Sequence, residues 1–428
     1  MGDVEAYWRL GEELRAPERM LALRLCGVGM ENVRLEEVPV PRPGPGQLLG
    51  RVDAVIACAS DNKIIDQGAE HTLMYGWDPA RHPVPIGHEG CITVAATGAG
   101  LGGEYARGRR FAVQPAVPSG PRDHRERYRN GGEGIRKLGM GYTLDGLFAE
   151  YVLVTEEVIE TGCLLPLPGP EMPYFAAALA EPLSCVVSGQ EHTVHILKEG
   201  PRAPRRAHLG IKPGGVTVVV GAGPMGRMHV EVALSRRPAK LIVSEPLAAR
   251  REKLQADLGE KARRAGAALI CTAPEEMRSA LARESEGRGA DDVILALGIA
   301  KLQEESLTWL APGGVANFFG GAKAGEHMIQ VDARRVHYDS IMAVGSSGGD
   351  PSDVATALRM LAEGTIEPGN YIAAVGGLDS ARALVEAVRE QRLEGKGVVY
   401  PHTRAPLEAV EGWDGERERA FLERNLVG

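Results

Sequence analysis

The sequence has few aromatic residues and no long apolar run. Phe, Trp and Tyr make up 5% of the 428 residues. The most apolar stretches, such as VTVVVGAG at 216–223 and DDVILALG at 291–298, have the length of strands, whereas a membrane-spanning helix needs about 20 apolar residues. The first 20 residues are charged and lack the apolar core of a secretory signal. We therefore expect no membrane span and no secretory leader.

Cysteine pairs and excess positive charge are also absent. The six cysteines are widely separated and never form a C-x-x-C pair, standing at Cys26, Cys58, Cys91, Cys163, Cys185 and Cys271. This favours reduced thiols in a cytoplasmic protein over a disulfide framework. Forty-nine Lys and Arg against 57 Asp and Glu give a net charge of −8. Such a charge repels nucleic-acid phosphates, so we expect no nucleic-acid partner.

The residues that are present indicate a globular protein of two large domains. The chain length corresponds to two or three domains of ordinary size. A hydrophobic content of 44% and a charged content of 25% exclude wholesale disorder. The 55 glycines show no three-residue period, which excludes collagen and implies many tight turns.

The pattern of secondary structure changes along the chain. Short β segments separated by Gly and Pro, such as residues 21–60 and 146–154, are typical of a barrel or meander. From about residue 211, apolar strands alternate with expected helices, which predicts a parallel sheet with crossover helices. These helices are expected at 224–236, 247–264, 274–285 and 301–310, and later ones at 352–363 and 380–392 before a strand at 396–401.

Three segments interrupt this plan. Segments 118–146 and 190–210 are insertions, and 403–428 is expected to form a charged terminal helix; surface structure with oligomer contacts is the simplest interpretation. The first insertion contains five arginines, Arg122, Arg125, Arg127, Arg129 and Arg136. Guanidinium groups match phosphate bidentately, so these side chains either bind a substrate phosphate or form a solvated basic surface.

A glycine-rich turn predicts a dinucleotide site. Gly221, Gly223 and Gly226 have G-x-G-x-x-G spacing, directly after a strand and at the start of an expected helix that includes Pro224 and Met225. In this context Gly221 permits the tight turn, Gly223 lets the backbone approach a pyrophosphate, and Gly226 lets the helix pack on the strand. The helix N-terminus attracts the phosphates. The alternative is a glycine-rich turn without a nucleotide.

An acidic residue after the next strand predicts which dinucleotide binds. Glu245 ends the strand LIVSE and stands 24 residues after Gly221. A carboxylate here can accept hydrogen bonds from the ribose hydroxyls and repels a 2′-phosphate, so NAD is favoured over NADP. Arg250 and Arg251 follow closely, and either could bind a 2′-phosphate instead.

Three further polar clusters together suggest a zinc site. They contain Cys58 with Ser60, His88 with Glu89, and Glu181. Separately, these residues could be a core thiol, a structural histidine and a helix cap. Together, a thiolate, an imidazole and carboxylates are ligands that tetrahedral zinc accepts, with one position open for substrate.

The spacing of these clusters leaves their convergence open. Adjacent residues on a strand point to opposite faces, so His88 and Glu89 could both reach one ion only if Gly87 and Gly90 bend the backbone. Otherwise Glu89 orients the site from outside the ligand set.

These motifs resemble those of a known family. GHEG at 87–90, EPLS at 181–184, the glycine-rich turn and the closing β segments occur in the order found in medium-chain zinc-type alcohol dehydrogenases. The resemblance covers about residues 21–402. EPLS is similar to the polyol branch, which includes sorbitol dehydrogenase. CASDNKIIDQG at 58–68 and EHTLMYG at 70–76 are similar to sugar-phosphate members such as L-sorbose-1-phosphate reductase.

The resemblance implies an α/β fold and a domain plan. A GroES-like β-barrel catalytic domain would span 21–187 and 351–402, and a Rossmann domain with a doubly wound parallel sheet would span 188–350. Residues 1–20 and 403–428 would be helical extensions. Relatives with a structural zinc carry four cysteines in a lobe corresponding to about 115–145; this chain has none there, so one catalytic zinc and no structural zinc are expected.

The resemblance also implies residue roles. Cys58 and His88 would be zinc ligands, Glu89 a third, and Glu181 a ligand or the partner of the zinc-bound water. Ser60 falls at the position of a proton-relay hydroxyl. Lys63 replaces a relay histidine found in many relatives, which leaves the far end of the relay open.

Two residues, His337 and Tyr338, fall where polyol dehydrogenases place substrate contacts, and core or interface packing is an equal alternative for both.

The implied activity is zinc- and NAD-dependent interconversion of a secondary alcohol and a ketone on a polyol, sugar or sugar phosphate, in a homodimer or homotetramer. The alternatives are a dehydrogenase for threonine or a simple secondary alcohol, a zinc-free quinone or enoyl reductase, and a non-catalytic dinucleotide-binding protein.

Overall fold

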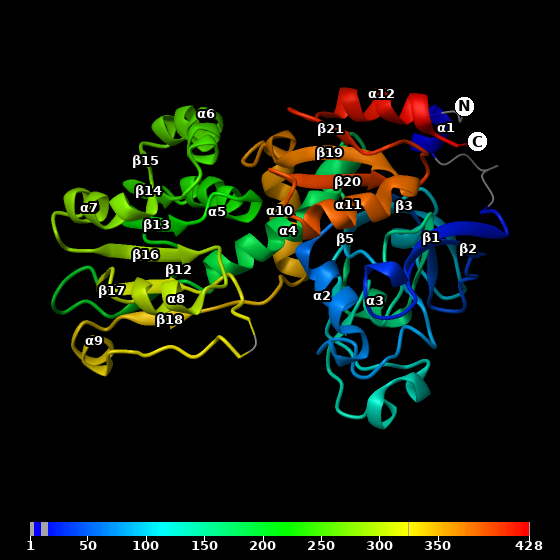
Figure 1. Ribbon diagram of the computed structural model, residues 1–428, viewed down its shortest axis with the longest axis horizontal. Coiled ribbons are helices and arrows are strands. Elements are labelled where there is room, and N and C mark those ends of the chain that lie inside the picture. Colours follow the sequence, from blue (N-terminus) through cyan, green and yellow to red (C-terminus); the bar gives the residue numbers. More distant parts are fainter. Residues whose placement is uncertain (1–3, 10–15, 324, 428) are drawn as a thin grey trace. The chain divides into compact units, whose positions relative to one another are not determined.

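The chain divides into two compact units. The computed structural model describes residues 4–9, 16–323 and 325–427. One unit comprises Met1–Pro182 with Asp350–Gly428, and the other comprises Leu183–Gly349. Figure 1 colours the chain along its length, so the first unit combines blue and cyan segments with orange and red ones. Within the described residues, no helix has both the length and the apolar character needed to cross a bilayer.

The first unit is built mainly from β-strands. Its largest sheet has the order β10-β6-β5-β3-β20-β19-β21, with β9 paired to β3. A second sheet has the order β2-β1-β4, and β7 pairs with β8. The strands are β1 Arg19–Leu25, β2 Val33–Pro39, β3 Leu48–Ile56, β4 Val84–Pro85, β5 Glu89–Thr97, β6 Arg110–Val113, β7 Ala116–Val117, β8 Leu138–Gly139, β9 Tyr151–Val154, β10 Leu164–Pro166, β19 Ile372–Gly377, β20 Lys396–Tyr400 and β21 Glu408–Ala409.

Helices and short turns complete this unit. The helices are α1 Val4–Arg9, α2 Ala59–Gln67, α3 Glu156–Glu160, α4 Tyr174–Glu191 (which continues past the unit boundary), α10 Pro351–Ala362, α11 Ala381–Arg389 and α12 Gly415–Asn425. The 3₁₀ turns are η1 Met30–Asn32, η2 Gly68–Glu70, η3 Gly103–Tyr105, η4 Arg125–Arg127, η5 Arg129–Gly132, η6 Pro368–Tyr371 and η7 Leu378–Ser380. The closing helix is shorter than the sequence suggests, because residues 408–409 pair with β19 and Pro406 has no amide hydrogen for a helix.

β3 explains how distant segments meet in the first unit. All nine of its residues are buried. Such a strand can pair on both edges, and β3 pairs with β5 and β9 on one side and with β20 on the other. Because Val398 lies opposite Ile56, the last strands of the chain return to the end of β3. This return brings residue 396 beside the segment that follows β3.

The second unit is a parallel six-stranded sheet with the order β15-β14-β13-β16-β17-β18. This is the doubly wound order that reverses between its first and fourth strands. Its strands are β13 Val216–Val220, β14 Lys240–Ser244, β15 Ala268–Thr272, β16 Ala290–Leu295, β17 Leu310–Asn317 and β18 Met342–Val344, and its helices are α5 Pro224–Ser235, α6 Ala248–Arg264, α7 Pro274–Glu284, α8 Ala300–Ser306 and α9 Ala333–Tyr338.

Two apolar clusters cover the two faces of this sheet. Leu254, Leu258 and Ala262 recur every four residues on α6 and pack with α5 residues against Val219. Met277 and Leu281 on α7 pack in the other cluster with Val216, Val218 and Val220 of β13. These valines alternate with Val219 and so lie on the opposite face of the sheet. The predicted alternation of strands and helices is confirmed, except that α8 ends at Ser306 rather than near 310. Strand β17 begins at Leu310 and takes the residues that follow.

The insertion at 190–210 forms a two-stranded hairpin in the second unit. β11 Val194–Leu197 pairs antiparallel with β12 Arg206–Leu209. On its inner face the buried His195 contacts Asp292 of β16, with Nε2 2.7 Å from the carboxylate. The outer face exposes Ile196 and Leu209.

Candidate metal centre and dinucleotide site

The end of β3 and the start of β5 bring together the residues of the candidate metal centre. Ile56, the last residue of β3, lies opposite Glu89, the first residue of β5. Cys58 follows two residues after Ile56 as the N-cap of α2, and His88 directly precedes β5. Gly87 has a φ of 93°, a conformation that glycine adopts without strain, so the chain turns immediately before the histidine.

Three of the predicted ligands converge. Cys58, His88 and Glu89 each offer a ligand atom, and these atoms lie within 4.8 Å of one another. His88 and Glu89 are buried and Cys58 is partly buried. The Ser60 hydroxyl is 3.0 Å from Cys58 Sγ and 3.0 Å from His88 Nε2. One thiol, one imidazole and one carboxylate in a single cluster form a donor set that suits zinc. The residues present therefore fit the ion.

Asp61 orients two of these residues and was missed by the sequence analysis. Its carboxylate accepts the Cys58 backbone N–H at 2.9 Å and contacts His88 Nδ1 at 2.9 Å. Burial opposes the charged form of His88, but Asp61 outweighs it and raises the pKa of the imidazole. A carboxylate on one ring nitrogen directs the other nitrogen to a metal. The available signal was the position of Asp61, three residues after the N-cap of α2.

Lys396, which no sequence motif singled out, lies against Glu89. Its ammonium group is 2.7 Å from both carboxylate oxygens of Glu89, and both side chains are buried. Burial alone would lower the pKa of Lys396, but Glu89, with further contributions from Cys58 and Glu181, raises it. Lys396 therefore supplies positive charge to a group of acidic ligands. Only the pairing of β20 with β3 brings it there.

Glu181 lies near the cluster without belonging to the convergent group. It is buried on α4, directly before Pro182, which interrupts the amide hydrogen bonds of that helix. Its charge helps to raise the pKa of Lys396. The ligand atoms within 4.8 Å of one another come from the other three residues.

Lys63 lies one helical turn beyond Ser60 on α2 and is exposed. Nearby, the ring of Tyr142 lies 5.8 Å from that of His88 and 5.4 Å from that of His71, centroid to centroid. Burial is the main cause that raises the pKa of Tyr142. Neither His71 nor Tyr142 stood out in the sequence, because no motif links them to the metal ligands.

The glycine-rich turn has the space that a dinucleotide needs. Gly221 directly follows β13 and has a φ of 97°. A Cβ on Gly226 would lie 1.9 Å from the Gly221 carbonyl oxygen, whereas a Cβ on Gly223 would meet nothing within 4 Å. Gly223 is the N-cap of α5, which begins with Pro224 and Met225. The backbone is thus closely packed at Gly226 and open at Gly223, where a pyrophosphate would approach.

Glu245 connects the second strand of this sheet to the turn. It is buried, and its carboxylate accepts the Ala222 N–H at 2.8 Å and the Leu247 N–H at 3.0 Å. Carboxylate oxygens accept more than one hydrogen bond each, so capacity remains for ribose hydroxyls. The guanidinium group of Arg251 donates to the Glu245 carbonyl oxygen. Arg250 lies on α6 and is partly buried.

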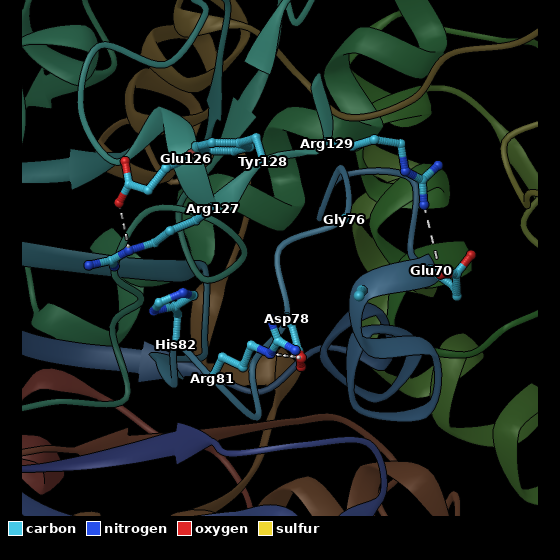
Figure 2. A pocket seen from close by; sticks show the side chains of 10 residues that line it. Glu70, Gly76, Asp78, Arg81, His82, Glu126, Arg127, Tyr128 and Arg129 are labelled. Carbon is cyan, nitrogen blue, oxygen red and sulfur yellow. Dashed lines mark ion pairs between the residues drawn. The ribbon is translucent and has the colours of Figure 1, made fainter. Parts of the chain in front are cut away.

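Part of the positive charge of segment 118–146 is balanced by carboxylates, which bears on the basic surface that was one of the two sequence-based alternatives. Three of them face acidic residues: Arg122 contacts Glu160, Arg127 contacts Glu126, and Arg129 contacts Glu70. Figure 2 shows the last two pairs, together with Arg81 beside Asp78, around a pocket of about 350 Å³. The carboxylates balance the guanidinium charges, because each arginine drawn there has its own acidic partner.

His337 and Tyr338 end α9 in the second unit, and both are exposed. Their rings contact each other at 4.6 Å between centroids. This exposure excludes packing in the core of the unit.

Comparison with known proteins identifies the family. Residues 44–166 match the alcohol dehydrogenase GroES-like domain, and residues 224–363 match the zinc-binding dehydrogenase domain. The chain belongs to the zinc-binding dehydrogenase family, as the sequence resemblance implied.

Individual relatives cover nearly the whole chain. An uncharacterized protein of Escherichia coli K12, YggP, is 30% identical over 89% of this chain and 87% of its own length. The mannitol-1-phosphate 5-dehydrogenase of Aliivibrio fischeri is 28% identical over 93% of this chain and 92% of its own. The L-sorbose 1-phosphate reductase of Klebsiella pneumoniae is 28% identical over 84% and 83%, respectively.

A solved structure of the same family has a similar fold. A zinc-binding dehydrogenase from Sinorhizobium meliloti 1021, bound to NADP, is 26% identical and superimposes with a TM-score of 0.68 over 90% of this chain and 100% of that one.

Proposed function

We propose that the protein is a zinc- and NAD(H)-dependent oxidoreductase that interconverts a secondary alcohol and a ketone on a polyol, sugar or sugar phosphate. The convergence of Cys58, His88 and Glu89 carries this proposal, because these residues match the donor set of a zinc ion with an open position. Membership of the zinc-binding dehydrogenase family supports it. The relatives named for polyol phosphates and sugar phosphates support the substrate class.

The metal-binding residues have distinct tasks in this proposal. Cys58 and His88 hold the ion, and Asp61 keeps His88 Nε2 directed toward it. Glu89 offers the third ligand, and Lys396 limits the negative charge that this carboxylate brings. Glu181 would be a further ligand or the partner of a water on the ion, and its charge also helps to raise the pKa of Lys396. When bound, zinc polarises the substrate oxygen as a Lewis acid, and NAD exchanges the hydride.

Ser60 moves the substrate proton. Its hydroxyl lies 3.0 Å from both His88 Nε2 and Cys58 Sγ, beside the two residues that would hold the ion and so beside the place where zinc would bind the alcohol. Ser60 would relay this proton: its oxygen accepts the proton of the alcohol as its own hydroxyl proton passes on to solvent, and reduction reverses both transfers.

The second unit binds the cofactor. The open backbone at Gly223 and the N-terminus of α5 receive the pyrophosphate. The Glu245 carboxylate accepts the ribose hydroxyls and disfavours a 2′-phosphate, which favours NAD. Arg250 is the residue that would favour NADP if it turned toward the ribose.

We also propose that the protein forms a homodimer or homotetramer through the β18 edge of this unit. β18 is the last strand of its sheet, and apolar side chains are exposed near it, including Met328 at 83% and Tyr338 at 69%. A second copy would cover them. The six free thiols support a reducing, cytoplasmic location.

The test is metal analysis combined with substrate profiling. We expect one zinc per chain, and reduction of NAD with a polyol or its phosphate in preference to threonine or a simple secondary alcohol. Activity should disappear on chelation and return with zinc. Turnover of an enone without metal would instead identify a quinone or enoyl reductase. Binding of zinc and NAD without turnover of any alcohol would contradict the proposal.

A further inference from the structure

Lys63 lies on α2, the helix that begins at the candidate metal centre. Ser60 and Lys63 are three residues apart on α2, a spacing that places their side chains on neighbouring positions of one helix face. Ser60 lies against Cys58 and His88, while Lys63 is exposed. The base of the Lys63 side chain is therefore about one helical turn from Ser60.

Lys63 has no acidic partner among the residues that the structure describes. The carboxylate one turn further along α2, Asp66, binds Arg389 at 2.6 Å. The next carboxylate in the sequence, Glu70, faces Arg129. The arginines of segment 118–146 that flank the pocket have acidic partners, as Figure 2 shows for Arg127 and Arg129. Lys63 thus lacks a carboxylate partner among the described residues, whereas Arg389, Arg127 and Arg129 each have one.

His71 lies near Lys63 and has a defined hydrogen-bonding capacity. The Leu73 N–H donates to His71 Nδ1 at 3.2 Å, so the neutral ring carries its hydrogen on Nε2. The ring is half-buried against Tyr142, which itself contacts the His88 ring. Burial, and secondarily the charge of Lys63, lower the pKa of His71. The His71 ring in its neutral form and the Lys63 ammonium group therefore both offer hydrogen-bond donors, and the charge of Lys63 reaches the His71 ring.

We propose that Lys63 and His71 form the subsite that binds the phosphate group of a phosphorylated polyol or sugar. This inference rests on the proposed function and specifies its substrate class. Both groups offer hydrogen-bond donors, and a phosphate offers only acceptors, with nearly two negative charges near neutral pH. A neutral hydroxyl would need an acceptor as well. A bound phosphate would also offset the effect of the Lys63 charge on the His71 imidazole.

Kinetic measurements on the zinc-loaded enzyme test the subsite. The values of kcat/KM for D-mannitol 1-phosphate and for D-mannitol are compared in the wild type, Lys63→Met and His71→Gln. We expect the wild type to prefer the phosphorylated compound, and Lys63→Met to reduce the ratio of the two values at least tenfold, mainly through KM for the phosphate. His71→Gln should reduce it less, because Gln keeps an N–H donor.

Arg129→Met is the matched control, since it removes a nearby cation that already has a carboxylate partner. It should leave the ratio unchanged. The proposal is overturned if the wild type prefers mannitol, or if Arg129→Met lowers the ratio as much as Lys63→Met.

A second measurement uses the metal-free and cofactor-free protein. Inorganic phosphate is titrated while NMR follows the His71 ring, assigned by comparison with His71→Gln. We expect saturable shifts and a higher His71 pKa at saturation, because a bound anion favours the imidazolium ion. Lys63→Met should abolish the phosphate dependence. Unchanged His71 signals in the wild type would overturn the subsite.

These two measurements separate the subsite from the proposed function. If the loaded enzyme reduces NAD with neither compound, the proposed function fails, and the His71 titration still decides whether the anion binds here.

Discussion

The two candidate sites of this protein are assembled in opposite ways. The dinucleotide turn lies in one short stretch of chain, from β13 through Gly226 into α5, and it presents mainly backbone. The metal cluster presents side chains from the β3–α2 junction and from β5, and is balanced by Lys396 near the other end of the chain. The first site depends on local backbone geometry. The second depends on the pairing of β3 with β5 and β20.

This difference has a consequence for mutation. Substitutions at the turn should affect cofactor binding and leave the metal in place. Substitutions of the metal ligands, or of residues in the paired strands β3, β5 and β20, should affect metal binding and leave cofactor binding unchanged. Single substitutions can test whether metal binding and cofactor binding respond independently, beginning with the largest expected effect.

Removing a ligand is expected to have the largest effect. Cys58→Ala should lose zinc and alcohol oxidation together, because the ion supplies several kcal/mol of charge stabilisation in the transition state. NAD affinity should stay at the wild-type value. Metal analysis, turnover and NAD titration check these outcomes. Cys271→Ala is the matched control, since this thiol lies in the second unit outside the cluster. Full zinc content in Cys58→Ala would contradict the assignment.

Removing Lys396 should destabilise the metal-free protein. Lys396→Met leaves the Glu89 carboxylate buried without its partner, which costs about 3 to 5 kcal/mol of unfolding free energy. Zinc should restore more stability to this variant than to the wild type, because the ion replaces the missing positive charge. Urea unfolding with and without zinc measures the effect.

The control for Lys396→Met is Lys240→Met, which breaks a more exposed pair with Glu284. It should show no zinc dependence beyond that of the wild type. An equal response of both variants to zinc would refute the role given to Lys396.

Glu418, near the end of the chain, contacts the helix that carries Glu181, so its substitution tests whether distant residues also stabilise the first unit. From α12 its carboxylate accepts the N–H groups of Tyr174 and Phe175, which begin α4, the helix that carries Glu181. Burial raises the pKa of Glu418 to about 7. The folded state therefore holds this proton more tightly than the unfolded chain, whose carboxyl has the ordinary pKa of about 4.3. The stabilisation is complete below that ordinary value and is lost as the pH rises to about 7.

Glu418→Gln should remove this pH dependence. We expect the free energy of unfolding of the wild type, relative to the variant, to fall by about 3 kcal/mol between pH 4.5 and pH 8. The exposed Glu416→Gln on the same helix is the control and should follow the wild type. If the profile of Glu418→Gln is parallel to that of the wild type, Glu418 does not titrate as described.

The turn should show the smallest and most local effects. Gly226→Ala places a Cβ against the Gly221 carbonyl and should cost about 1 to 3 kcal/mol of stability. Gly223→Ala has room for its Cβ, so it should fold normally but bind NAD about tenfold more weakly, which corresponds to about 1.4 kcal/mol. Both variants should keep their zinc. Normal NAD affinity in Gly223→Ala would show that the cofactor does not approach this position.

Patterns of contiguous residues predicted much of the fold. Apolar strand-length runs such as 216–220, in alternation with expected helices, predicted the parallel sheet and its crossover helices, because these patterns report on burial. The segments around Pro406 and Leu310 were assigned less well, since strand pairing overrode local helix propensity there.

The candidate site was only partly predictable. Cys58, His88 and Glu89 carry recognisable chemistry, so they could be named in advance. Asp61, Lys396 and His71 could not, because charged or imidazole side chains are common throughout the chain and only their neighbours distinguish them. Arg122 and Arg129 of segment 118–146 show the same limit, since their acidic partners, Glu160 and Glu70, lie outside the segment.

The sequence by itself determined the class of fold, the glycine-rich turn and the types of ligand available to a metal, because these depend on periodicity, local backbone freedom and side-chain chemistry. Tertiary structure decided which ligands meet, which cation balances them and which cation lacks an acidic partner. Those outcomes depend on strand register and burial, which join residues that no sequence spacing connects.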